Sequence, residues 1–161
     1  MTSPLADDIS ITISDEFITS GWRRSGGHPM KFLFPLGRLL FSLIFIAAAP
    51  RHFTNEGIQH AANLGVPIAR VLVPLSGVLA LAGGISVALG YKTRWGAWAL
   101  IVFLIPVTLW MHAYWKLSDP AAIHIQNAMF SKNISMLGAA LLISQFGAGP
   151  FSIDERRGLG S

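Results

Sequence analysis

Most of the chemistry that this sequence could perform is concentrated in one stretch, residues 110–133. It holds two tryptophans, two histidines, two lysines, one aspartate, one glutamine and two asparagines between apolar runs. Helical spacing puts His112 and Trp115 on one face of a helix, and Gln126 and Asn133 on one face of the next. If the two faces meet, they form a polar pocket with an aromatic wall.

Such a pocket suits a quinone head group, which needs hydrogen-bond donors for its carbonyl oxygens, a flat aromatic wall and lateral access from lipid. Trp115 would provide the stacking wall. The candidate head-group donors are His112, Gln126, Lys132 and Asn133. The neighbouring residues interpreted as membrane anchors, because such side chains gather at membrane interfaces, are Trp110, Tyr114 and Lys116.

The composition indicates a membrane protein. Of 161 residues, 52% are hydrophobic and 12% charged, against about a quarter charged in soluble domains. The net charge of +4 comes from Lys and Arg residues that stand at the edges of apolar runs, which is typical of topology signals and argues against nucleic acid as a partner. The absence of cysteine excludes disulfides, thiol chemistry and cysteine-ligated clusters within the chain.

The hydropathy pattern predicts an all-α integral membrane four-helix bundle formed by residues 31–150. A helix of roughly 20 residues crosses the hydrocarbon core, and the predicted helices cover about 32–49, 69–89, 95–115 and 126–146. A short interfacial helix is expected in the polar loop near residues 56–64. In the second run, small residues recur every four positions, which predicts close helix packing and a central place in the bundle. These residues are Ser76, Ala80, Gly84 and Ala88.

The positive charges predict the orientation. With the N-terminus inside, eight Lys and Arg residues fall on the cytoplasmic side and four on the other, so both termini are expected in the cytoplasm. Residues 1–30 and 151–161 then form cytoplasmic tails, and residues 110–133 face outward. Within the first tail, residues 9–13 alternate as a half-buried strand would, with a flexible tail as the competing interpretation.

Arg38 is a charge inside the first apolar run, where no acidic residue is available to pair with it. It must therefore use water, carbonyl groups, lipid phosphate or a partner protein. The sequence favours extension of the side chain toward the cytoplasmic head groups, with contact to an anionic lipid or a partner protein as the alternative. The histidines show no metal-ligand spacing, so no metal site is expected.

Several short motifs, in this order, resemble the DoxX family of small bacterial four-helix membrane proteins, over about residues 36–153. They are Gly37-Arg38-Leu39, Leu64-Gly65-Val66-Pro67, Ala82-Gly83-Gly84, Leu89-Gly90-Tyr91-Lys92-Thr93-Arg94, His112-Ala113-Tyr114-Trp115, and Gln126-Asn127 through Lys132-Asn133 into Leu137-Gly138. One departure lies after the first helix, where Ala48-Ala49-Pro50-Arg51-His52 stands in place of the family's Ser-Gly pair and lysine.

The resemblance implies a multi-pass inner-membrane protein related to a subunit of an archaeal thiosulfate:quinone oxidoreductase and to membrane-associated oxidative-stress complexes. It carries over no agreed catalytic site. The pattern residues that it marks as ligand-binding candidates are His112, Trp115, Gln126, Asn127, Lys132 and Asn133.

The sequence therefore supports two functional hypotheses. The first is a membrane subunit of an electron-transfer system that contacts quinone, holds no covalent cofactor and is not catalytic alone. The alternative is a non-catalytic scaffold or assembly subunit, which would bind other membrane proteins through the small-residue stripe and the N-terminal tail. Lipids are expected partners in both cases, and a homo-oligomer is left open. A small-solute transporter is disfavoured, since four helices leave little room for alternating access.

Overall fold

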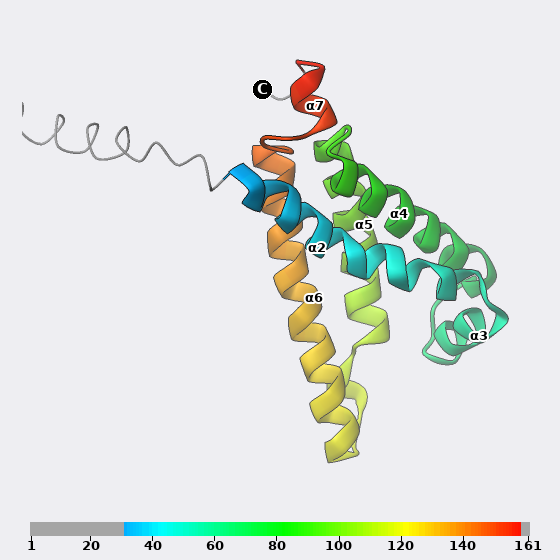
Figure 1. The fold of residues 1–161 in the computed structure, drawn as a ribbon. Helices are drawn as coiled ribbons and strands as arrows, with labels where there is room; N and C mark the ends of the chain where they lie inside the picture. The colour runs from blue at the N-terminus through cyan, green and yellow to red at the C-terminus, as the bar shows by residue number, and fades with distance from the viewer. Residues whose placement is uncertain (1–30, 159–161) are drawn as a thin grey trace, which may run out of the picture. The chain divides into compact units, whose positions relative to one another are not determined.

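The computed structural model describes residues 31–158, and all of the regular structure in that range is helical (Figure 1). The predicted tail of residues 1–30, with its strand-like segment, lies outside the described residues. The elements are α2 (Leu33–Ala48), η2 (Ala49–Phe53), α3 (Asn55–Asn63), α4 (Ala69–Leu89), α5 (Thr93–Met111), η3 (Tyr114–Lys116), α6 (Pro120–Phe146) and α7 (Ile153–Arg156).

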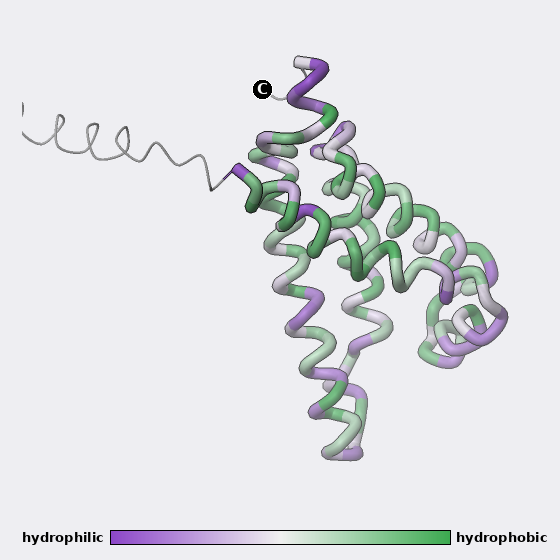
Figure 2. Tube along the Cα trace, in the orientation of Figure 1, coloured by the Kyte–Doolittle hydropathy of each residue, from purple (hydrophilic) through white to green (hydrophobic). Residues whose placement is uncertain are grey.

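Three helical segments of the described chain are long and apolar enough to cross a membrane: Leu33–Phe53, Ala69–Leu89 and Thr93–Lys116. The first runs from α2 into η2, and the third from α5 into η3. With 27 residues, α6 is longer than any of them, but polar residues interrupt its apolar sequence, and Figure 2 shows hydrophilic positions along much of its length. The all-helical membrane class is confirmed, with three spans recognisable by composition.

The central helix is α4, which packs against α2, η2, α3 and α5. Its glycines allow the close approach. A Cβ on Gly83 would lie 2.9 Å from the carbonyl oxygen of Gly96 on α5, and one on Gly84 would lie 3.0 Å from Ile46 on α2. The small-residue stripe predicted on this helix is therefore used inside the molecule, and Ala80 within it is only 1% exposed.

Two apolar clusters hold the helices together. The larger joins α2, α4 and α5, and its buried members are Phe45, Ala80, Val87, Ala97, Leu100, Phe103 and Leu104. The smaller fixes α3 against the start of α4 through Ala61, Ala69 and Val73. A side-chain cap at the start of α3, where Thr54 accepts a hydrogen bond of 3.1 Å from the Gly57 N–H, begins this short helix.

The connection between α5 and α6 differs from the expected one. The third helix was expected to reach residue 115, but α5 ends at Met111, because His112 has a non-helical backbone (φ −124°, ψ 36°). The fourth helix was expected from residue 126 and begins six residues earlier. Asp119 accepts a hydrogen bond of 2.8 Å from the Ala122 N–H, and Pro120 occupies the first helical position, where its missing N–H costs nothing.

The C-terminal residues are not a free tail. The segment 147–157, which includes α7, folds back onto the end of the bundle where α2 begins and where α4 turns into α5. The rings of Phe32 and Phe151 stack with centroids 5.3 Å apart, and the Asp154 N–H donates to the Gly90 carbonyl at 2.8 Å. Both ends of the described chain therefore lie at one end of the bundle (Figure 1), while η2, α3 and η3 lie at the other.

Candidate functional site

A cavity of about 530 Å³ opens between α4, the second half of α5 and the middle of α6. Helices α4 and α5 are in close contact near Gly83 and Gly96 and diverge toward the end that carries α3 (Figure 1). The cavity occupies this wedge, and α2, η2 and α3 contribute its remaining wall. Its volume falls within the range of about 300–1,000 Å³ that is usual for small-molecule sites.

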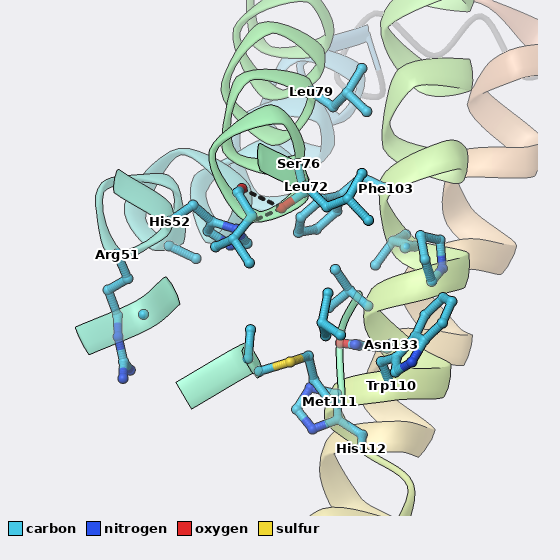
Figure 3. A pocket seen from close by; sticks show the side chains of 18 of the residues that line it. Arg51, His52, Leu72, Ser76, Leu79, Phe103, Trp110, Met111, His112 and Asn133 are labelled. Carbon is cyan, nitrogen blue, oxygen red and sulfur yellow. Dashed lines mark hydrogen bonds between the residues drawn. The ribbon is translucent and has the colours of Figure 1, made fainter. Parts of the chain in front are cut away.

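Apolar side chains form most of the wall, with a smaller group of polar ones. Figure 3 shows Trp110, Met111, His112 and Asn133 on one side of the cavity, with His52 and Ser76 on the other. The polar and charged lining residues are Arg51, His52, His60, Ser76, His112, Lys132 and Asn133.

On the α4 side, a hydrogen-bond chain fixes His52. The Ser76 hydroxyl donates to the Val73 carbonyl at 2.7 Å, which uses its only proton. The 2.9 Å contact between Ser76 Oγ and His52 Nδ1 therefore has the histidine as donor. A Cβ on Gly77 would collide with the His52 side chain, so this glycine provides the space that the imidazole needs.

On the other side, His112 joins the end of α5 to α6. Its Nδ1 lies 2.8 Å from Gln126 Oε1, and since the amide oxygen can only accept, Nδ1 donates. Further along α6, the Lys132 ammonium group makes a long contact of 3.4 Å with the Met129 sulfur. Asn133 is only 4% exposed.

The structure brings together half of the residues predicted for the site. His112, Lys132 and Asn133 line the cavity, and Gln126 supports it through His112. The other two do not line it. Trp115 packs edge-on against Phe130, with ring centroids 5.7 Å apart, and Asn127 is exposed on α6.

Sequence reasoning missed the part of the lining that comes from η2, α3 and α4. Arg51, His52 and His60 were assigned to a loop outside the membrane, and Trp110, interpreted as an anchor, also lines the cavity. The signal that could have placed them is the Thr54 cap, because a capped α3 holds the loop in one position beside α4.

Arg38 was expected to contact lipid or a partner, but its guanidinium is used inside the described chain. It is 6% exposed and donates to the carbonyl oxygens of Ala148 and Phe151, the latter at 2.8 Å, with a longer contact of 3.5 Å to that of Pro150. The charge is therefore satisfied by carbonyl groups of the C-terminal segment, one of the ways that the sequence left open.

Asp154 completes this network, which we call the C-terminal clasp (Arg38 together with residues 147–157). Its carboxylate accepts hydrogen bonds from the backbone N–H groups of Lys92 and Thr93, at 2.7 and 2.9 Å, and so caps α5 from a distant part of the chain. Burial alone would raise the pKa of Asp154, but these two backbone hydrogen bonds and the charge of Arg38 outweigh it and hold the pKa below its usual value.

The fold and the cavity define a class: a helical, multi-pass membrane protein with a lateral cavity. The sequence model of the SURF4 family matches residues 23–158, so the chain belongs to the SURF4 family. Inner membrane protein YphA of Escherichia coli is 30% identical over 132 residues, which are 81% of this chain and 94% of that protein.

Two further relatives extend the comparison. Inner membrane protein YqjF of Escherichia coli is 28% identical over 122 residues, covering 74% of this chain and 88% of its own. The ER-derived vesicles protein ERV29 of Saccharomyces cerevisiae is 31% identical over 80 residues, which are 50% of this chain and 26% of ERV29. No solved structure gives a significant match. With its three apolar helices and these inner-membrane relatives, the protein is a multi-pass protein of the inner membrane.

These findings correct two predictions. The resemblance to the DoxX family is wrong, because the family that matches is SURF4. The interpretation as a quinone-linked subunit of an electron-transfer system, argued from the polar and aromatic residues of 110–133 and from that resemblance, is also wrong: the chain belongs to the SURF4 family, and none of the three relatives is described as an oxidoreductase. The expectations that the chain has no covalent cofactor and no metal site stay predictions.

Proposed function

We propose that this protein is a non-catalytic membrane protein that binds other membrane proteins along the exposed face of α6. The observation that carries the proposal is the polarity of this helix. Its 27 residues include no window as apolar as those of the three recognised spans, yet its principal neighbours are only α5 and η3. A helix with one long neighbour exposes most of its circumference, and in a bilayer that surface is expected to be apolar.

Part of the exposed surface of α6 is apolar and includes Ile134 and Leu142, but one face is small and polar. Ser131, Ser135 and Gly138 recur at spacings of four and three on one face and are exposed, and a Cβ on Gly138 would meet nothing within 4 Å. Small and hydroxyl-bearing residues let a second helix approach closely within lipid and form hydrogen bonds there. The partner surface is thus assigned to α6 and not to the α4 stripe, which is buried inside the molecule.

The relatives support this proposal by what their names describe. Two are inner membrane proteins and the third is a protein of ER-derived vesicles, descriptions that concern membranes and no reaction. A role in binding other membrane proteins is consistent with all three descriptions.

A cysteine scan tests the partner face, since the natural chain has no cysteine. We expect Ser131→Cys and Ser135→Cys, treated in intact membranes with a cysteine-reactive photo-crosslinker, to give adducts larger than the monomer, because a second protein covers these positions. The matched control is Val78→Cys on α4, which is 52% exposed and faces lipid in this proposal. The adduct mass separates a second copy of this chain from another protein. Lipid adducts alone at all three positions would contradict the proposal.

The proposal also includes the topology, in which α6 spans the membrane as a fourth helix and both termini are cytoplasmic. The excess of Lys and Arg at the end that carries the C-terminal clasp supports it. We expect Ser118→Cys to react with an impermeant maleimide added to intact cells, and Arg156→Cys to react only after the cells are opened, both positions being exposed. Labelling of both variants from the same side would show that α6 does not cross.

A further inference from the structure

The cavity combines an apolar wall with positive charge. Its lining holds Arg51 and Lys132 and neither Asp nor Glu. Most of the remaining wall is apolar, from Ile44 on α2 through Leu79 on α4 to Pro106 on α5. Such a lining favours a molecule with an apolar chain and an anionic head group, because the chain replaces lipid or water against the wall and the head group neutralises the cations.

A second observation, the state of Asn133, points to a polar ligand group. Asn133 is only 4% exposed, and therefore 96% buried. Within residues 31–158 its side-chain amide makes no hydrogen bond. The buried side-chain atoms sealed without a partner in this range belong to Arg38, Ser42 and Thr93. The amide of Asn133 is not among them, so it keeps access to the cavity that it lines (Figure 3).

A buried amide without a hydrogen-bond partner is unfavourable, and a ligand that bonds to it removes this cost. Lys132, the preceding residue on α6, lines the same cavity. An amide donor beside an ammonium group is a suitable site for a carboxylate or phosphate oxygen.

We propose that this cavity binds a single-chain amphiphile with an anionic head group. The head group is held by Lys132 and Asn133 on α6, with Arg51 across the cavity, and the chain follows the apolar wall between α4 and α5. The head group is a carboxylate or a phosphate, so the ligand is a fatty acid or a lysophospholipid. This site is separate from the proposed partner face of α6, so each proposal can fail without the other.

The test uses the full chain, purified in a neutral detergent and stripped of lipid, with binding followed by native mass spectrometry. Two matched pairs of probes separate charge from chain length: palmitate against hexadecanol, and palmitoyl lysophosphatidylglycerol against monopalmitoylglycerol. We expect each anionic probe to bind at least about tenfold more tightly than its neutral partner. The anionic probe that binds more tightly identifies the preferred head group as a carboxylate or a phosphate.

Two variants connect the binding to the named residues. We expect Lys132→Gln and Asn133→Leu each to lower the affinity for the anionic probe about tenfold and to leave the affinity for the neutral probe unchanged. The control is Arg70→Gln, which removes an exposed positive charge at the same end of the bundle but outside the cavity lining. Since Asn133 is buried and its variant can misfold, the exposed Lys132 provides the decisive measurement. Three results would overturn the proposal. The first is equal affinity for the anionic and neutral probes. The second is a loss of affinity in Arg70→Gln as large as that in Lys132→Gln, and the third is an apolar peptide that stays bound to the purified protein and that no probe displaces.

Discussion

Replacing Arg38 with alanine is expected to lower the free energy of unfolding by about 3–5 kcal/mol, the range for removing one side of a buried charged network. The guanidinium is buried and donates to carbonyls of the C-terminal segment. Without it these carbonyls lose their donor and Asp154 loses a favourable charge. Lysine should not restore the stability, because a single ammonium group cannot reproduce the planar fork of the guanidinium.

The measurement is the thermal unfolding midpoint of the purified protein in detergent, together with trypsin cleavage after Arg156 and Arg157. We expect faster cleavage in Arg38→Ala, since the C-terminal segment detaches when its contacts are lost. Arg70→Ala is the control, because Arg70 is exposed at the other end of the bundle and should leave both readouts unchanged. A wild-type midpoint in Arg38→Ala would show that the C-terminal clasp does not stabilise the fold.

The second large effect is expected at Asp154, where alanine should cost about 2–3 kcal/mol. The carboxylate accepts from two backbone N–H groups at the start of α5, and the residue before this helix provides no side-chain cap of its own. Removing the carboxylate leaves these donors unsatisfied. Glu155→Gln is the matched control on the same short helix, because Glu155 is exposed and its side chain accepts a hydrogen bond only from the nearby Phe151 N–H within the described residues.

The same carboxylate predicts a pH dependence. Its pKa in the folded protein is held below the ordinary value, which is about 3.9 in an unfolded chain. The stability that it contributes is therefore fully present above about pH 4 and is lost as the pH falls through the lower, folded-state pKa. The difference in unfolding midpoint between wild type and Asp154→Asn should be constant from pH 7 to pH 5 and shrink below pH 4. A difference that grows in acid would contradict this.

Much of the fold follows from local sequence. The bounds of α4 coincide with a mainly apolar run that ends before Gly90. The backbone of Gly90 is left-handed (φ 65°), and a Cβ there would clash with Ser152. The break between α5 and α6 was misplaced because apolar residues continue past Met111. The local signal for the start of α6 was present as Asp119-Pro120, a capping residue followed by a proline.

The site was only partly predictable, for a physical reason. His112, Lys132 and Asn133 lie on or next to two helices that are consecutive in the chain, so their convergence could be argued from helical spacing on the condition that the two faces meet. Arg51 and His52 reach the same cavity because η2 continues α2 and packs on α4, a tertiary contact at which the Thr54 cap of α3 only hints. The assignment to the DoxX family was wrong because short motifs of glycine and single charged residues are compatible with many small helical membrane proteins.

The bond between Arg38 and the Ala148 carbonyl spans 110 residues, and this has a consequence for biosynthesis. At about 5–20 residues per second, Arg38 leaves the ribosome roughly 5–20 s before its acceptors are made. During that interval the first helix carries an unpaired charge next to lipid, which disfavours its release from the insertion machinery. The Arg38 guanidinium therefore gains these hydrogen-bond acceptors only after residues 148–151 have been made.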